Sequence, residues 1–384
     1  MNYEEWMKSE LLIDEEKGLL RTLHMAGPSE ASTTIDGKTV MMGASNNYLG
    51  FATDPKVKAA AIRAIEKNGV GSGGARLTTG NMNEHEQLEK AIAAFKGTEA
   101  ALIFSSGFLA NVGTITALAT EGSVIFSDEL NHASLIDGCR LSKGKTVVYR
   151  HADIRDLESK LYKYRDVQRK YIVTDGVFSM DGDIAPLPDI AFLARSYNAL
   201  VIVDDAHATG VIGSHGRGSA DYFGVKVDIT IGTMSKALGS EGGFVCGSDV
   251  LIRFLRQKAR TFIFQTSLSS GIVAAAKESI HLLQQSEKRV HRLQEISIRV
   301  RKELQGMGYK VPAGITPIIP IMIGDAEEAV SFSKSLLEED IYIPAIRPPT
   351  VPIGSSRLRL ALMATHTDEQ IAHLLSVFQT LTKE

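Results

Sequence analysis

The sequence has 384 residues, of which 44% are hydrophobic and 23% charged, values typical of a globular protein rather than a disordered, collagen-like or disulfide-stapled one. A formal net charge of −3 disfavours nucleic acid and anionic membrane surfaces as partners. The two cysteines are too few for a disulfide framework or a four-ligand zinc site. We therefore assign no metal ligands, expect no membrane span and no secretion signal, and expect a cytoplasmic protein.

The N-terminal part carries a charged helical pattern over residues 3–20, followed by the segment TTIDGKTV. Within that segment Asp36-Gly37 is a favourable pair for a tight turn, which predicts two short strands. We expect residues 1–48 to form an arm or cap.

Between residues 49 and 285 helical stretches alternate with short apolar runs and polar or glycine-rich loops. Most of these runs do not alternate between apolar and polar residues, a pattern typical of strands that are covered on both faces. The pattern predicts a large α/β domain with a mostly parallel seven-stranded sheet flanked by helices. The predicted strands are 101–104, 124–127, 147–149, 171–175, 200–204, 229–232 and 243–247.

The C-terminal part differs in composition from the part before it. A long helix is predicted over 268–285, and charged helical sequence follows Glu287. Shorter strands with turns then lead to a last helix over 368–381. We expect residues 286–384 to form a smaller α/β domain.

The segment from Gly69 to Gly74 fits the G-x-G-x-x-G pattern of dinucleotide-binding sites. That pattern must follow a strand, whereas residues 55–67 predict a helix. We therefore favour a structural glycine loop, with a nicotinamide oxidoreductase as an alternative.

Three loops at predicted strand ends carry the better candidates for a reactive site. Strand 171–175 leads to Ser179, strand 200–204 leads to Asp204 and His207, and strand 229–232 leads to a loop with Lys236. The carboxyl ends of parallel strands converge on one crevice, so these groups are expected to lie together. A lysine amine in such a place can form a Schiff base if burial lowers its pKa.

These groups match what pyridoxal phosphate requires: a lysine, a carboxylate for the ring nitrogen and donors for the phosphate. Ser105 to Phe108 follow a predicted strand and open a helix, so their backbone N–H groups can hold a phosphate. Thr233 and Ser235 can add hydroxyl donors. His132, at another strand end, can lie flat on the cofactor ring.

With SDELNHAS, TDGVFSMDGDIAPL, VDDAHATGVIG and TMSKALG as landmarks, the chain resembles the α-oxoamine synthase family of fold-type I pyridoxal phosphate enzymes. The resemblance runs from about residue 20 to the C-terminus and implies the aminotransferase-like fold. It implies that Lys236 bears the cofactor as a Schiff base, Asp204 pairs with the ring nitrogen and His207 bonds the phenolic oxygen. The other implied cofactor residues are His132 and Ser179 at the ring, and Gly107, Phe108, Thr233, Ser235 and Thr266 at the phosphate. The resemblance also implies a homodimer with shared active sites, in which Thr266 reaches the phosphate bound by the partner subunit.

For substrate the resemblance implies Arg21, Asn47, His132, Thr350 and Arg357. Arg357 and Arg359 alternate on one predicted strand and point the same way, so spacing does not decide which of them binds the amino-acid carboxylate. Relatives carry Glu where this chain has Asp175, whose side chain is one methylene shorter. The resemblance therefore does not say which polar contact the carboxylate of Asp175 makes.

Residues 345–359 resemble the member of the family that acts in biotin synthesis. This implies decarboxylative condensation of L-alanine with pimeloyl-CoA or pimeloyl-acyl carrier protein. The alternatives are a sister synthase that joins glycine to a short acyl-CoA and a pyridoxal phosphate aminotransferase.

Overall fold

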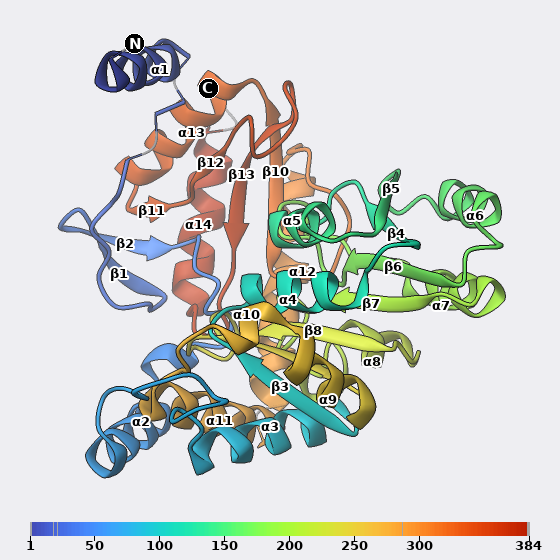
Figure 1. Cartoon of the computed structure of the whole chain (residues 1–384). Helices are drawn as coiled ribbons and strands as arrows, with labels where there is room; N and C mark the ends of the chain where they lie inside the picture. The colour runs from blue at the N-terminus through green and yellow to red at the C-terminus, as the bar shows by residue number, and fades with distance from the viewer. Residues whose placement is uncertain (1, 18, 21, 286, 382–384) are drawn as a thin grey trace.

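A computed structural model describes residues 2–17, 19–20, 22–285 and 287–381. Its centre is a seven-stranded sheet in the order β3-β9-β8-β7-β6-β4-β5 (Figure 1). Strands β8, β7, β6, β4 and β5 run parallel, and β9 is antiparallel to β8 and β3. All seven predicted strands are confirmed. Their bounds are β3 Ala100–Phe104, β4 Ser123–Asp128, β5 Lys145–Tyr149, β6 Arg169–Asp175, β7 Leu200–Asp204, β8 Ile229–Thr233 and β9 Gly243–Gly247.

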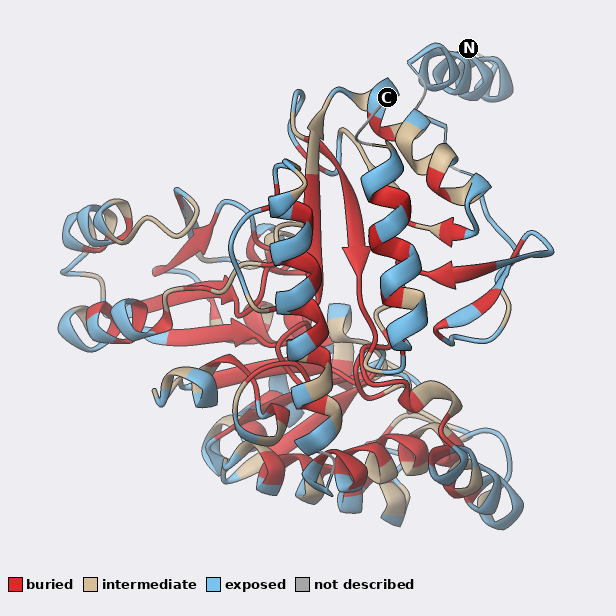
Figure 2. Cartoon of the chain, turned by 180° about the vertical axis from the view of Figure 1, so that it is seen from behind, coloured by how far each residue is buried: buried red, intermediate tan, exposed pale blue. Residues whose placement is uncertain are grey.

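Helices cover both faces of this sheet, because its apolar strands have no polar face to expose. One hydrophobic cluster packs the sheet against α4, α5, α9 and α10, and another packs it against α6 and α7. Figure 2 shows most of the sheet as buried. The helices of this part are α2 Pro55–Asn68, α3 Asn83–Lys96, α4 Gly107–Leu118, α5 Ala133–Leu141, α6 Ile154–Lys163, α7 Leu187–Tyr197, α8 Ser219–Phe223, α9 Asp249–Lys258, α10 Arg260–Ile263 and α11 Ser270–Gln285, with short 3-10 turns at Phe51–Thr53 and Ser214–Gly216.

The glycine-rich segment after α2 is a loop that leads into α3. It follows a helix, so it lacks the strand, turn and helix order that a dinucleotide site needs. The interpretation of Gly69 to Gly74 as a structural loop is therefore confirmed.

The C-terminal part contains two small sheets, in the orders β10-β13-β12 and β1-β2-β11. The predicted N-terminal hairpin is confirmed, and its second strand pairs in parallel with β11 from the other end of the chain. The bounds are β1 Ser32–Ile35, β2 Lys38–Met42, β10 Ile318–Gly324, β11 Ile341–Tyr342, β12 Ala345–Ile346, β13 Ser356–Ala361, α12 Glu287–Gly306, α13 Ala326–Glu338 and α14 Asp368–Leu381.

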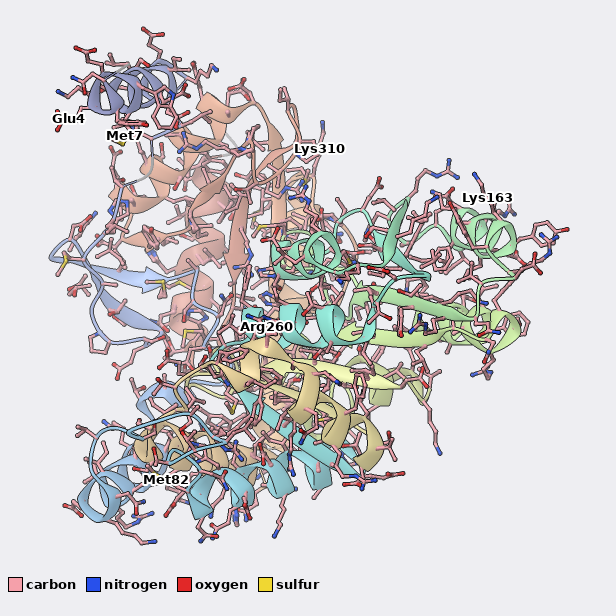
Figure 3. All side chains as sticks on the ribbon, viewed as in Figure 1. Glu4, Met7, Met82, Lys163, Arg260 and Lys310 are labelled. Atoms are coloured by element: carbon pink, nitrogen blue, oxygen red, sulfur yellow. The ribbon has the colours of Figure 1, made fainter. Side chains whose placement is uncertain are left out.

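Helix α1 (Tyr3–Glu16) has no buried residue and lies apart from the two main parts, as the labels of Glu4 and Met7 show (Figure 3). None of the described helices is long and apolar enough to cross a bilayer.

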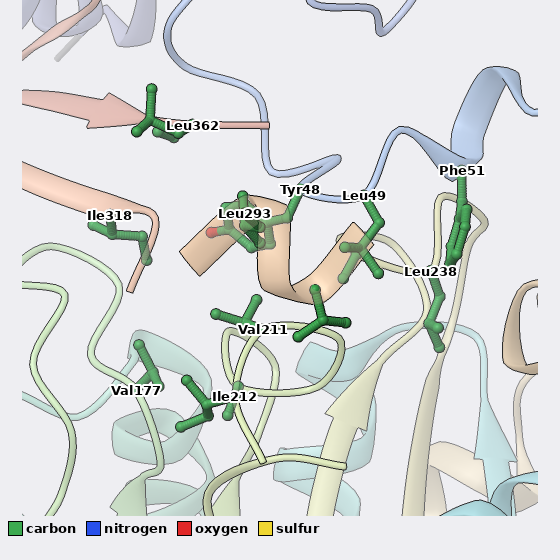
Figure 4. Close-up of a cluster of buried hydrophobic side chains, with 14 of the residues drawn as sticks. Tyr48, Leu49, Phe51, Val177, Val211, Ile212, Leu238, Leu293, Ile318 and Leu362 are labelled. Atoms are coloured by element: carbon green, nitrogen blue, oxygen red, sulfur yellow. The ribbon is translucent and has the colours of Figure 1, made fainter. Parts of the chain in front are cut away.

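One hydrophobic cluster joins the C-terminal part to the large sheet (Figure 4). It brings Tyr48 and Leu49 from the N-terminal segment against Val211 from the loop after β7, and against Leu293 on α12. All four side chains are buried. Tyr48 is therefore held beside the carboxyl end of β7, where the candidate site lies.

Candidate active site

The loops that follow β4, β6, β7 and β8 bring their polar residues to one edge of the sheet, as expected for parallel strands. Lys236 Nζ lies 2.9 Å from His207 Nε2, although the two residues come from different loops. Asp175 and Asp204 end neighbouring strands and stand opposite each other in the register. Both carboxyl groups interact electrostatically with Lys236. The predicted meeting of lysine, imidazole and carboxylate is thus present.

The two carboxyl groups are bonded differently. Asp204 accepts hydrogen bonds from the Ala206 amide at 2.9 Å and from Asn111 Nδ2 at 2.6 Å. Burial raises the pKa of Asp175 well above its ordinary value, and the charge of Asp204 adds to this. Asp175 Oδ2 accepts the backbone N–H of His132 at 2.7 Å. The Asp175 carboxylate therefore holds the backbone of His132 in place at the start of α5.

The environment of Lys236 favours a free amine. Burial lowers the pKa of Lys236, the nearby cation of Arg359 acts in the same direction, and Asp204 and Asp175 oppose them. Burial also lowers the pKa of His207 well below its ordinary value, and the positive charge of Arg359 acts in the same direction. His207 is therefore a neutral imidazole between an amine and the hydroxyl of Tyr48, which lies 2.7 Å from Nδ1.

His132 caps the N-terminus of α5, where its Nδ1 accepts the amide N–H of Ser134 at 3.2 Å. The residue is exposed at the strand-end edge. Its ring is thereby anchored at one nitrogen and open on its surface, a state compatible with stacking on a flat ligand.

The N-terminus of α4 is built to receive an anion. Ser106 caps it by accepting the Leu109 amide at 3.1 Å, and this cap leaves the first amides, those of Gly107 and Phe108, without a side-chain partner. A Cβ on Gly107 would lie 3.2 Å from Thr233 Cβ, so Thr233 sits directly against this turn. The Ser235 amide donates to Thr233 Oγ1 at 3.1 Å, which brings a second hydroxyl residue to the same place. Backbone donors and a helix dipole at one point suit a phosphate.

Two buried arginines on β13 face different partners. Arg357 forms an ion pair with Asp181 and donates from Nε to the Ser355 carbonyl. Arg359 donates from Nε to the Ser179 carbonyl at 2.6 Å and from Nη2 to Asn46 Oδ1 at 3.2 Å. Of these two arginines, Arg359 is the one whose positive charge lowers the pKa of Lys236.

The other sequence candidates lie farther out or in structural roles. The Asn47 side chain donates to the Ser29 carbonyl at 2.8 Å and accepts from the Ala52 amide at 3.3 Å. Thr350 is exposed and lines a cavity of about 170 Å³ together with Arg347. Thr266 is exposed, and Arg21 lies outside the described residues.

Residues 38–378 match the family described as aminotransferase class I and II. The chain belongs to this family. It is 53% identical to a protein of Lysinibacillus sphaericus named 8-amino-7-oxononanoate synthase, over 98% of each chain. It is also similar to a solved serine palmitoyltransferase with PLP (33% identity, TM-score 0.93, 98% of each chain) and to 8-amino-7-oxononanoate synthase from Francisella tularensis (29% identity, TM-score 0.76, 90% of this chain and 98% of that one).

The donor set suits the cofactor of this aminotransferase-like fold. A partly buried lysine faces a neutral imidazole, a carboxylate ends the adjacent strand, and the glycine turn at α4 leaves two amides beside Thr233. Among the described residues no group of three or more His, Cys, Asp or Glu side chains is placed to hold a metal ion. The arrangement therefore fits pyridoxal phosphate, with each predicted contact type available.

Sequence reasoning missed three residues that the structure places around the site: Asn111 on Asp204, Tyr48 on His207, and Asn46 on Arg359. Asn111 lies four residues after Gly107 on the same helix, so its helical spacing was the signal that pointed inward. Tyr48 and Asn46 gave no comparable signal, because nothing local relates residues 46–48 to the loops after β7 and β8.

Proposed function

We propose that this family member condenses L-alanine with a pimeloyl thioester and forms 8-amino-7-oxononanoate, CO2 and free thiol. The observation that carries the proposal is the Lys236 amine, 2.9 Å from the neutral His207 at an edge shared with Asp204. The identity of 53% over nearly the whole chain to a protein named for this product supports the substrate class.

Pyridoxal phosphate, when bound, supplies an electron sink for the α-carbon of the amino acid. Lys236 would carry it, Asp204 would hold its ring nitrogen and His207 its phenolic oxygen. His132 and Ser179 would lie at the ring. The amides of Gly107 and Phe108 and the hydroxyls of Thr233 and Ser235 would hold its phosphate.

Lys236 is the residue that moves protons in this mechanism. Since burial lowers its pKa, its nitrogen can accept the α-proton of the amino acid and later return it. A carbon–carbon bond forms between the α-carbon and the acyl carbon as the thiol leaves, and the carboxyl group is then lost as CO2. On one side of Lys236 the buried residues His207 and Arg359 keep water away from its amine.

We assign the amino-acid carboxylate to Arg359 rather than to Arg357. Arg357 already forms an ion pair with Asp181, whereas the partners of Arg359 are two uncharged oxygens, the Ser179 carbonyl and Asn46 Oδ1. The positive charge of Arg359 also lowers the pKa of Lys236. A guanidinium beside the reacting amine holds a carboxylate in a fixed orientation. Asn47, His132 and Thr350 remain further candidates for substrate contact, and Arg21 is a candidate outside the described residues.

We further propose a homodimer with shared sites, in which Thr266 reaches the phosphate of the partner subunit. Thr266 is exposed and precedes Ser267, whose amide donates to the Gly74 carbonyl at 3.0 Å and whose hydroxyl donates to the Gly80 carbonyl at 2.6 Å. The glycine loop thus supports the segment that would cross to the partner. Two buried free cysteines support a cytoplasmic location. Light scattering and the cofactor affinity of Thr266→Val test the dimer.

The test of function is thiol release by the purified, pyridoxal phosphate-loaded protein. We expect release with L-alanine plus pimeloyl-CoA or pimeloyl-acyl carrier protein, and none from Lys236→Ala. Release only with glycine and acetyl-CoA, or only with serine and palmitoyl-CoA, would assign a sister synthase. Formation of pyruvate from alanine with no thiol release would assign an aminotransferase.

A further inference from the structure

Asn111 lies one turn into α4, the helix whose first amides are proposed to hold the cofactor phosphate, and its side chain is buried. Its Nδ2 carries two hydrogens, of which one is donated to Asp204 Oδ2 at 2.6 Å and the other to Ser134 Oγ at 2.8 Å. Asp204 ends β7 and Ser134 belongs to α5. This one amide group therefore joins three elements of the site.

The orientation of the Asn111 amide follows from its neighbours. An amide oxygen facing Asp204 would oppose the carboxylate, so the NH2 group must be the one that is turned toward it. Asn111 Oδ1 is then buried and, within the part of the chain that the structure describes, has no hydrogen-bond partner. An unpaired acceptor in the interior costs free energy. The arrangement thus favours the contacts to Asp204 and Ser134 over full pairing of the amide itself.

Ser134 extends this connection to His132. The backbone N–H of Ser134 donates to His132 Nδ1 at 3.2 Å, so that nitrogen has a lone pair and no hydrogen. The Ser134 hydroxyl lies 2.7 Å from the same nitrogen and therefore donates to it, while its oxygen accepts from Asn111. The hydrogen bonds thus run in one direction, from the Asn111 amide to the ring that is proposed to lie on the cofactor.

The two carboxylate oxygens of Asp204 are held by different parts of the chain. Oδ1 accepts the Ala206 amide at 2.9 Å, a bond within its own loop, and Oδ2 accepts from Asn111. Of these two bonds, the second ties the carboxylate to another element. Asn111 lies four residues after Gly107, which is about 6 Å along the axis of α4. The same helix therefore carries the phosphate donors and the support for the carboxylate.

We propose that Asn111 is a positioning residue that sets the Asp204 carboxylate for the ring nitrogen of pyridoxal phosphate. Through Ser134 it also sets the ring of His132 against the face of the same cofactor. The inference rests on the proposed function, in which Asp204 binds the ring nitrogen. A carboxylate whose two oxygens are already fixed meets the ring N–H without having to reorient, which strengthens binding.

The test compares two ligands of the cofactor-free protein by equilibrium dialysis: pyridoxal phosphate and the analogue in which C–H replaces the ring nitrogen. The wild type should bind pyridoxal phosphate more tightly, because only this ligand has a nitrogen for Asp204. Asn111→Leu, which is similar in size, should lose about tenfold in affinity for pyridoxal phosphate and much less for the analogue, as expected for one weakened charge-assisted hydrogen bond. Asn111→Ser, whose side chain is too short to bridge both partners, should show the same selective loss.

Two further variants separate positioning from structural damage. Ser134→Ala keeps the bond between Asn111 and Asp204 and removes the hydroxyl bond to the stacking histidine. It should weaken both ligands by a similar factor and leave the ratio of their affinities unchanged. Thr114→Val is the matched control, since Thr114 is buried on the same helix and its hydroxyl has no partner among the described residues. Both of its affinities should equal those of the wild type.

The outcomes separate this inference from the proposed function. Equal losses of affinity for the two ligands in Asn111→Leu and Asn111→Ser would show that Asn111 does not act through Asp204, and the cofactor assignment would stand. A wild type that binds both ligands equally would overturn the contact between Asp204 and the ring nitrogen, and this inference with it. No binding of either ligand by the wild type would overturn the cofactor assignment itself.

Discussion

His151 joins two of the loops that form the active site, and its pairing makes stability depend on pH. Its Nδ1 lies 3.0 Å from Asp128 Oδ1, and its Nε2 lies 2.8 Å from Asp183 Oδ2. Asp128 ends β4 ahead of His132, and Asp183 closes the loop that contains Ser179. Both ring nitrogens face carboxylates, which favours the imidazolium.

The magnitude follows from the pKa of His151. Burial lowers it, but hydrogen bonds from the ring to Asp128 and Asp183 outweigh burial and raise the pKa to about 10. Because this value exceeds the ordinary 6.5, the stabilisation is complete below about pH 6.5 and is lost as the pH rises through about 10. The difference of about 3.5 pH units corresponds to about 5 kcal/mol. With 22% of the His151 side chain exposed, solvent screening reduces this to about 3 kcal/mol.

The assay is the free energy of unfolding from urea titrations of wild type and His151→Gln between about pH 6 and pH 10.5. The wild type should be more stable by about 3 kcal/mol at the lower pH, and the gap should narrow steadily toward the higher pH. His291→Gln is the control, since His291 meets Glu287 at 3.6 Å on the surface and should change stability by less than about 0.5 kcal/mol. A gap between wild type and His151→Gln that stays constant over the whole range would refute this reasoning.

Three further predictions concern the carboxylate site, the loop after β7 and the glycine loop. Arg359→Lys should raise the KM for alanine about tenfold or more, and Arg357→Lys should raise it less, because of the two only the charge of Arg359 influences the reacting amine of Lys236. Steady-state kinetics of both variants measure the two KM values. Lys96→Met should lower the free energy of unfolding by about 3 to 5 kcal/mol in urea titrations, since it leaves the buried Asp205, 3.0 Å from Nζ, without its cation; a loss below about 1 kcal/mol would contradict this. In Gly80→Ala the new Cβ would overlap a backbone carbonyl within the glycine loop, so thermal unfolding should occur at lower temperature; an unchanged midpoint would contradict this.

The sequence by itself determined the large sheet and the identity of its reactive groups. Each predicted strand lies within two residues of the observed bounds. For the inner strands the reason is that a strand buried on both faces must be a continuous apolar run, whereas the edge strand β5 is largely exposed. Lys236, His207 and Asp204 were predictable as neighbours for a related reason: the carboxyl ends of parallel strands share one edge whatever the details of packing.

Only the tertiary structure decided what surrounds those groups. Arg357 and Arg359 are two residues apart on one strand, about 7 Å along its length. How β13 packs against the large sheet therefore decides which of the two guanidinium groups lowers the pKa of Lys236. Tyr48 reaches His207 across 159 positions of sequence, through a core that joins the N-terminal segment, the loop after β7 and α12. No local pattern encodes such a contact, because it depends on how separately formed elements pack and not on the periodicity within any one of them.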